Sequence, residues 1–162
     1  MITLIVTFFG IGRLHPAPGT WGSLAATILA VLLYRAGGAY LLPLAFLLVT
    51  MLGFWAVPLA LVDSTEPDPG EIVIDEVAGQ WLALCFTMIP LARHGVPIMS
   101  AWPAFVVPFL MFRLFDIWKP WLVGSADRRG DPVGLMLDDL WAGLFAGLTS
   151  VVLAGLYHGL MR

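Results

Sequence analysis

The sequence predicts an all-α fold, a polytopic membrane helical bundle of about five spanning helices. Hydrophobic residues make up 60% of the chain, charged residues only 12%, and the mean hydropathy is +0.92. Soluble domains carry about 25% charged residues, so this composition is typical of a protein surrounded by lipid. The length of 162 residues suits one domain. We therefore expect residues 1–162 to form a single membrane-embedded unit.

Five runs without Asp, Glu, Lys or Arg locate the expected spans. They contain 21, 27, 16, 19 and 22 residues, and a helix that crosses a bilayer needs roughly 20 apolar residues. The spans expected from these runs are 20–34, 39–62, 75–91, 100–115 and 138–160. The first and the third are short, so a bundle of four spans is the alternative.

Alternation of the five spans separates the charged segments by side. Segments 10–23, 63–79 and 113–139 fall on one side, together with all eleven acidic residues, and the turns 35–38 and 93–97 fall on the other. The acidic side also carries five of the eight basic residues. The positive-inside rule places the side with more basic residues in the cytoplasm. The five are Arg13, Arg113, Lys119, Arg128 and Arg129, and the three on the other side are Arg35, Arg93 and Arg162. We expect a multi-pass membrane protein whose acidic segments face the cytoplasm.

Five carboxylates stand at the ends of three predicted helices, and we expect them to hold a metal ion or act as general base. They are Asp75, Glu76, Asp116, Asp138 and Asp139. Oxygen-only ligand sets favour Mg²⁺, Mn²⁺ or Ca²⁺ over zinc, and a divalent cation relieves the repulsion among crowded acids. Ionisable residues at membrane depth are usually functional. The alternative is five unrelated acids that complement helix dipoles. The remaining acids are expected to be solvated connectors: Asp63, Glu66, Asp68, Glu71, Asp127 and Asp131.

Small residues at four-residue steps predict a close helix contact beside two of these acids. Asp139, Gly143 and Gly147 share one helix face, which is typical of a tightly packed interface and turns Asp139 toward the bundle interior. Gly79 follows Asp75 by four residues, so another backbone can approach the Asp75 side of that helix closely. The pattern indicates that the two acids lie inside the bundle.

The cations of segment 113–119 are the expected phosphate contacts. Arg113, Asp116 and Lys119 lie along one stripe if the helix continues to Lys119 and stops at Pro120. Arg113 and Lys119 are then placed to neutralise charge on a phosphate.

Segment 10–23 supplies weaker candidates for substrate binding. Its Gly and Pro residues break the helix, after which Thr20 or Ser23 can cap the first span. A helix N-terminus offers free N–H groups to a phosphate, and Arg13 and His15 would add side-chain donors. The alternative is an ordinary turn with an N-cap.

Several classes of protein are excluded or disfavoured by the sequence. The net charge of −3 argues against a nucleic-acid partner. Leu91 stands where a cysteine phosphatase built on Cys85 would need arginine, and His15 and His94 fall on opposite sides. An ion-coupled transporter is the main rival, but span 39–62 carries no charge, and span 100–115 carries one only near its end, at Arg113. A scaffold would give the clustered acids no role. Attack by metal-activated water on a phospholipid in the bilayer remains, without a phosphoenzyme.

Four motifs in order resemble the phosphatidylglycerophosphatase A family of bacteria. They are GxxxPxPGTxGS at 12–23, IVIDExxGQ at 72–80, FRLFDIxKP at 112–120 and GxMxDDxxAG at 134–143. The resemblance implies an inner-membrane, Mg²⁺-dependent enzyme that hydrolyses phosphatidylglycerophosphate to phosphatidylglycerol and inorganic phosphate at the cytoplasmic face. Two features depart from the family pattern: Leu122 stands where a proline is expected, and segment 126–132 is more highly charged.

Overall fold

The computed structural model describes residues 1–37, 40–62, 64, 66 and 68–160. Ala39 at the start of an expected span, the expected connector Asp63 and the C-terminal Arg162 lie outside the described residues. The regular elements in the described part are all helical, which confirms the all-α prediction. They are α1 (Ile2–Val6), η1 (Ile11–Arg13), α2 (Pro18–Gly37), α3 (Leu41–Leu61), α4 (Ile74–Arg93), η2 (Ile98–Ala101), α5 (Pro103–Trp118), α6 (Leu122–Asp127) and α7 (Pro132–Leu160).

A helix occupies each of the five expected spans, but the helices differ in their capacity to cross a membrane. Within the described residues, α3 and α7 are the two that are both long and apolar enough. Helix α4 carries two acids and an arginine, and α5 has only 16 residues, about 24 Å at 1.5 Å per residue. Two apolar helices indicate association with a membrane; the five-span topology remains a prediction.

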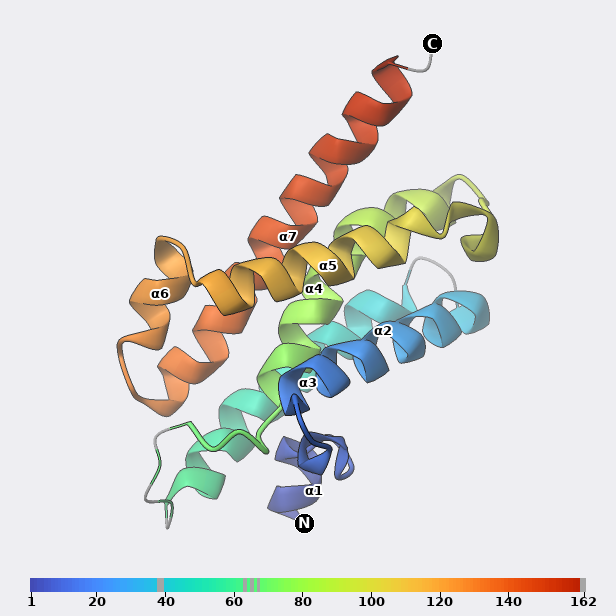
Figure 1. Cartoon of the computed structure of the whole chain (residues 1–162). Coiled ribbons are helices and arrows are strands. Elements are labelled where there is room, and N and C mark those ends of the chain that lie inside the picture. The colour runs from blue at the N-terminus through green and yellow to red at the C-terminus, as the bar shows by residue number, and fades with distance from the viewer. Residues whose placement is uncertain (38–39, 63, 65, 67, 161–162) are drawn as a thin grey trace.

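Helix α4 lies in the middle of the bundle, packed against α2, α3, α5 and α7 (Figure 1). Small residues on α4, including Ala78, Gly79 and Ala83, leave no exposed surface and let its neighbours approach closely. The Trp81 indole N–H donates a hydrogen bond of 2.8 Å to the Ala26 carbonyl and so joins α4 to α2. The acids at the start of α4 are therefore surrounded by other helices.

Large apolar side chains remain exposed on the outside of the bundle. Leu47, Met51 and Trp55 of α3 are all exposed, as is every α7 residue from Val151 to Leu160. This last third of α7 extends beyond the other helices (Figure 1). Soluble monomers seldom expose contiguous apolar surface on this scale, so the surface suits a lipid environment.

Helix α7 begins earlier than the sequence analysis predicts, at Pro132 instead of residue 138. Asp131 caps it, because the Asp131 Oδ1 accepts a hydrogen bond of 2.6 Å from the Gly134 N–H. Hydrogen bonds from Arg129 and this N–H lower the pKa of the Asp131 carboxyl. Asp138 and Asp139 consequently lie inside the helix and not at its mouth.

The ends of the helices that carry the motifs gather at one end of the bundle. The starts of α2, α4 and α7 and the end of α5 lie there, whereas α2 ends and α5 begins at the opposite end (Figure 1). Segment 113–139, expected to be a loop after Lys119, contains the additional short helix α6 at this end. The arrangement brings all four sequence motifs to one region.

Candidate metal and phosphate site

Direct backbone contact between α4 and α7 sets the geometry of the site. A Cβ at Gly143 would lie 2.2 Å from the Gly79 carbonyl oxygen, and one at Gly79 would lie 2.4 Å from the Asp139 carbonyl oxygen. Any side chain larger than hydrogen would separate the two helices. The predicted close contact on the Gly79 and Gly143 faces is confirmed, and Gly147 extends it against the Phe86 ring.

The crossing brings three carboxylates together. One oxygen from each of Asp75, Glu76 and Asp139 lies within 4.8 Å of the others. Asp75 and Asp139 are only 5% and 4% exposed. Among the described residues, Glu76 Oε2 and Asp139 Oδ1 are buried without a hydrogen-bond partner. Buried carboxylate oxygens are costly without a partner, so this cluster could hold a metal ion.

Asp116 and Arg113 extend the cluster from α5. The Arg113 Nη1 lies 2.5 Å from the Asp116 Oδ2, and the Asp116 carboxyl is close enough to the Asp139 carboxyl for their charges to interact. Arg113 also donates a long hydrogen bond of 3.4 Å to the Ser23 hydroxyl of α2. Four of the five expected carboxylates thus lie in one connected group, with a guanidinium beside them.

The first turn of α2 faces this group. A Cβ at Gly19 would lie 2.1 Å from the Glu76 Oε1 and 3.3 Å from the Arg113 Nη1, so a larger residue there would displace the Glu76 carboxylate. The expected capping role of Thr20 and Ser23 is not observed, because Pro18 already starts the helix and both residues lie inside it. The Ser23 hydroxyl instead donates to the Gly19 carbonyl at 2.8 Å.

Two expected substrate contacts of segment 10–23 lie apart from the group. Arg13 forms a surface ion pair with Glu71 at 3.1 Å, and His15 is exposed. The described contacts of these two residues do not include the clustered carboxylates. Arg13 and His15 therefore remain predictions that the geometry does not join to the cluster.

Lys119 lies between two carboxylates at the end of α5. Its Nζ forms ion pairs with Asp127 Oδ1 of α6 and, at 3.2 Å, with Asp138 Oδ2 of α7. Partial burial lowers the pKa of the Lys119 ammonium, but the hydrogen bonds and charges of Asp127 and Asp138 outweigh it, so the pKa is raised. Lys119 therefore carries its positive charge across the physiological range. Asp127, expected to be a solvated connector, has a charged partner.

A cavity of about 350 Å³ opens beside the group and gives it access from outside. Its lining combines the start of α2, the segment before α4 and the end of α5. The lining residues are Ala17, Pro18, Gly19, Asp68, Gly70, Ile72, Glu76, Arg113, Asp116, Ile117 and Lys119. Carboxylates and cations thus meet at one opening, as binding of a phosphate beside a metal ion requires.

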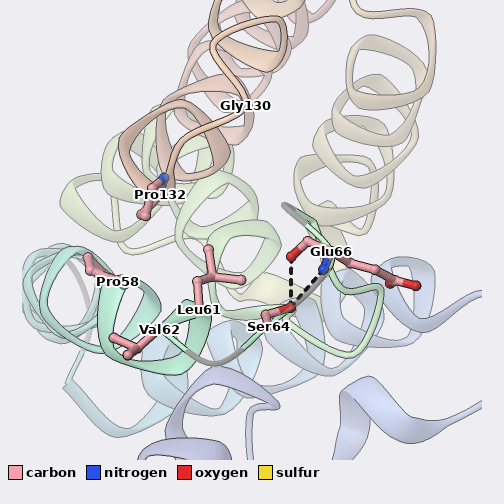
Figure 2. Close-up of a pocket in the computed structure, with 7 residues that line it drawn as sticks. All are labelled: Pro58, Leu61, Val62, Ser64, Glu66, Gly130 and Pro132. Carbon is pink, nitrogen blue, oxygen red and sulfur yellow. Dashed lines mark hydrogen bonds between the residues drawn. The ribbon is translucent and has the colours of Figure 1, made fainter.

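A second hollow of about 390 Å³ lies at the end of α3, against the turn before α7 (Figure 2). The Ser64 hydroxyl donates a hydrogen bond to the Glu66 carbonyl and accepts one from the Glu66 N–H. The Glu66 carboxylate points away from Leu61 and Pro132. The described lining of this hollow contains no cation. It lacks the combination of charges found in the first cavity, so we assign it no role.

Three polar residues with notable surroundings are absent from the site candidates that the sequence predicts. Asp68 lines the cavity, Asp127 holds Lys119, and Gln80 is fully buried with both amide atoms unpartnered among the described residues. Gln80 follows Glu76 by four residues, and this spacing indicates that the two side chains share a helix face. Asp68 and Asp127 lie outside any periodic pattern, so no local signal marks them.

Comparison with known proteins assigns the chain to a family. A sequence profile of the phosphatidylglycerophosphatase A family matches residues 4–154. The chain belongs to that family. A protein of Haemophilus influenzae named phosphatidylglycerophosphatase A is 36% identical over 146 residues, which cover 90% of this chain and 83% of the relative. Membership of the phosphatidylglycerophosphatase A family makes the chain a phosphatase.

Two further relatives have similar coverage. The phosphatidylglycerophosphatase A of Escherichia coli is 32% identical over 151 residues, or 88% of this chain and 77% of the relative. A Bacteroides thetaiotaomicron protein with the provisional name phosphatidylinositol-3-phosphatase is 35% identical over 153 residues, or 88% and 87%. No solved structure matches the chain. The names of the family's relatives thus include two different lipid headgroups.

Proposed function

We propose that this protein hydrolyses phosphatidylglycerophosphate to phosphatidylglycerol and inorganic phosphate at a membrane surface. The observation that supports it best is the junction of the carboxylate cluster with Arg113 and Lys119 at one cavity. A phosphate monoester needs both halves of such a site, a group that activates water and cations that neutralise charge on the phosphoryl oxygens. Family membership and the names of two relatives support the choice of substrate.

The residues of the cluster suit Mg²⁺. Their donor atoms are all carboxylate oxygens, which hard divalent cations prefer. A bound cation would give the unpartnered Glu76 Oε2 and Asp139 Oδ1 a partner. Asp75, Glu76 and Asp139 would hold the ion, with Asp116 and Asp138 as further ligands or general base. When bound, Mg²⁺ supplies Lewis-acid activation of a water molecule and neutralises charge on the phosphoryl oxygens.

The side chains around the cavity bind and orient the phosphate. Arg113 presents a planar guanidinium, which pairs with two phosphate oxygens at once, and its ion pair with Asp116 fixes its direction. Lys119 adds a second positive charge to the lining of the cavity. The Ser23 hydroxyl accepts a hydrogen bond from Arg113, and Thr20, Arg13 and His15 are outer candidates for contact with the headgroup. A carboxylate of the cluster takes the proton of the attacking water, without a phosphoenzyme.

The setting is that of a multi-pass protein of the bacterial inner membrane, with residues 1–162 as one phosphatase domain. In the proposed five-span topology the cavity lies at the cytoplasmic face, where the lipid substrate is reached from the bilayer. Exposed apolar surface on α3 and α7 supports insertion. Labelling of a Ser125→Cys variant by a membrane-impermeant reagent tests the orientation, since the native Cys85 is buried. Labelling from the periplasm would contradict it.

Phosphate release by the purified protein from phosphatidylglycerophosphate in mixed micelles tests the activity. We expect turnover with Mg²⁺, none with chelator, and much slower release from phosphatidylinositol 3-phosphate. Asp75→Asn, Asp116→Asn and Asp139→Asn should each lose about a hundredfold or more, because each removes charge stabilisation at the reacting group. Asp131→Asn is the matched control, since it removes a charge from a cap outside the cluster. Wild-type rates in all three variants would refute the site.

A further inference from the structure

Lys119 occupies a backbone conformation that a lysine rarely adopts. It ends α5 with φ 51° and ψ 51°, in the left-handed region that favours glycine. Its N–H donates to the Phe115 carbonyl at 2.8 Å, and Pro120 follows it. Glycine would suit this turn better by backbone preference alone. A lysine at this position indicates that the side chain has a role that the backbone does not provide.

Helix α6 packs directly against this turn. A Cβ at Gly124 would lie 2.5 Å from the Lys119 carbonyl oxygen, so α6 approaches the Lys119 backbone closely. Asp127, the last residue of α6, then brings its carboxylate onto the Lys119 ammonium. The contact joins two residues eight positions apart through the fold of α6.

The two carboxylates on Lys119 differ in their surroundings. Asp138 has a side chain only 10% exposed and precedes Asp139 of the cluster, whereas the Asp127 side chain is 40% exposed. Lysine has a long, flexible side chain. With Asp138 alone it would be drawn toward the cluster, and with both carboxylates it is held at the edge of the cavity that it lines.

We infer that Asp127 is a positioning residue that holds the Lys119 ammonium at the cavity for contact with the substrate phosphate. Asp127 lies outside the described lining of the cavity and acts through Lys119. The inference rests on the proposed function for the identity of the phosphate, although the ion pair itself does not depend on it. Loss of Asp127 should therefore weaken the affinity for a phosphate more than it slows the chemical step.

Steady-state kinetics on phosphatidylglycerophosphate separate these quantities. Asp127→Asn should raise KM on the order of tenfold, the effect of losing one charge-assisted hydrogen bond, with kcat changed less than threefold. Asp127→Glu should restore most of the affinity. Asp131→Asn removes the same charge from the same segment, retains an oxygen that can cap α7, and should leave KM unchanged. An unchanged KM in Asp127→Asn, or an equal rise in Asp131→Asn, would overturn the inference.

A double-mutant cycle tests the route through Lys119. In a Lys119→Met background, Asp127→Asn should have no further effect on KM, because the ammonium that it holds is absent. Additive effects would show that Asp127 acts independently and would overturn the inference. The melting temperature of each variant in detergent identifies any variant that fails to fold. If Asp127→Asn fails to fold, the KM of Asp127→Glu still tests the inference.

Equilibrium binding of inorganic phosphate distinguishes this inference from the proposed function. Wild-type protein that binds phosphate, with weaker binding in Asp127→Asn than in Asp131→Asn, supports the role of Asp127 even if phosphatidylglycerophosphate is not hydrolysed. In that case only the assignment of phosphatidylglycerophosphate as the substrate would be wrong. Equal phosphate affinity in the two variants, or no measurable binding by the wild type, would overturn the inference.

Discussion

Gly143 of α7 lies against the carbonyl oxygen of Gly79 in α4, where a Cβ would come within 2.2 Å of that oxygen. Asp75 and Asp139 each precede one of these glycines by four residues and so stand one helical turn along the same faces. The position of the carboxylates is therefore set by a contact at which the two helices have no side chains.

Gly143→Ala should reduce both stability and activity. The added methyl group meets backbone atoms that cannot move aside, and overpacking of this kind costs about 1–3 kcal/mol. Separation of α4 from α7 would also pull Asp139 away from Asp75. Melting temperature in detergent and phosphate release measure the two effects. Gly155→Ala is the control, because its added Cβ meets nothing within 4 Å among the described residues; equal losses in the two variants would contradict the prediction.

Activity should disappear with chelator and return with Mg²⁺. Asp139→Asn should weaken the affinity for Mg²⁺ by about tenfold or more, because the amide removes a negative charge from a set of oxygen ligands. Titration of activity against free Mg²⁺ gives the apparent dissociation constant, and Mn²⁺ binding followed by electron paramagnetic resonance gives one without turnover. Full activity in excess chelator would exclude a metal-dependent mechanism.

Arg113→Lys should raise KM for the lipid phosphate about tenfold. Lysine keeps the charge but loses the paired donors that suit a phosphate, along with the geometry that Asp116 and Ser23 impose. Arg93→Lys makes the same substitution in an exposed residue at the opposite end of the bundle and should change nothing. A KM for Arg113→Lys equal to that of the wild type would remove Arg113 from the phosphate contacts.

Gln80→Met should raise the melting temperature in detergent. The Gln80 side chain is fully buried, and both its amide atoms are unpartnered among the described residues. Each unsatisfied buried group costs about 1–3 kcal/mol, and an apolar side chain of similar size avoids that cost. Leu84→Met, one turn farther along α4, is an ordinary core replacement and should lose less than about 1.5 kcal/mol. A lower melting temperature in Gln80→Met would indicate that the amide has partners in the folded protein.

Local patterns in the sequence were sufficient for much of the fold. Charge-free runs located all five long helices, because burial in lipid or in the bundle excludes charge along a whole helix. Four-residue spacing predicted the close contact at Gly79 and Gly143, since residues at this spacing share a helix face. The stop before Pro120 also agreed with local chemistry, because proline lacks a backbone N–H and disfavours the helical conformation of the residue before it.

The boundaries of α7 and the existence of α6 were missed for a physical reason. Asp131 looks like one charge among several in segment 126–132, and only its hydrogen bond to the Gly134 N–H shows that it caps a helix. Segment 122–127 has no strong apolar period, and α6 is held by packing against Lys119 and α7. Tertiary contacts decided both features.

The sequence by itself determined the helical class, the family motifs and the candidate carboxylates, because these depend on residue type and on spacing within one helix. Only the tertiary structure decided which candidates meet. Asp75, Glu76 and Asp139 converge through a crossing of helices some sixty residues apart, while Arg13 pairs with Glu71 on the surface. The partnership of Lys119 with Asp127 likewise depends on where α6 packs. Contacts between distant helices depend on the shape of both surfaces, and no local spacing encodes that.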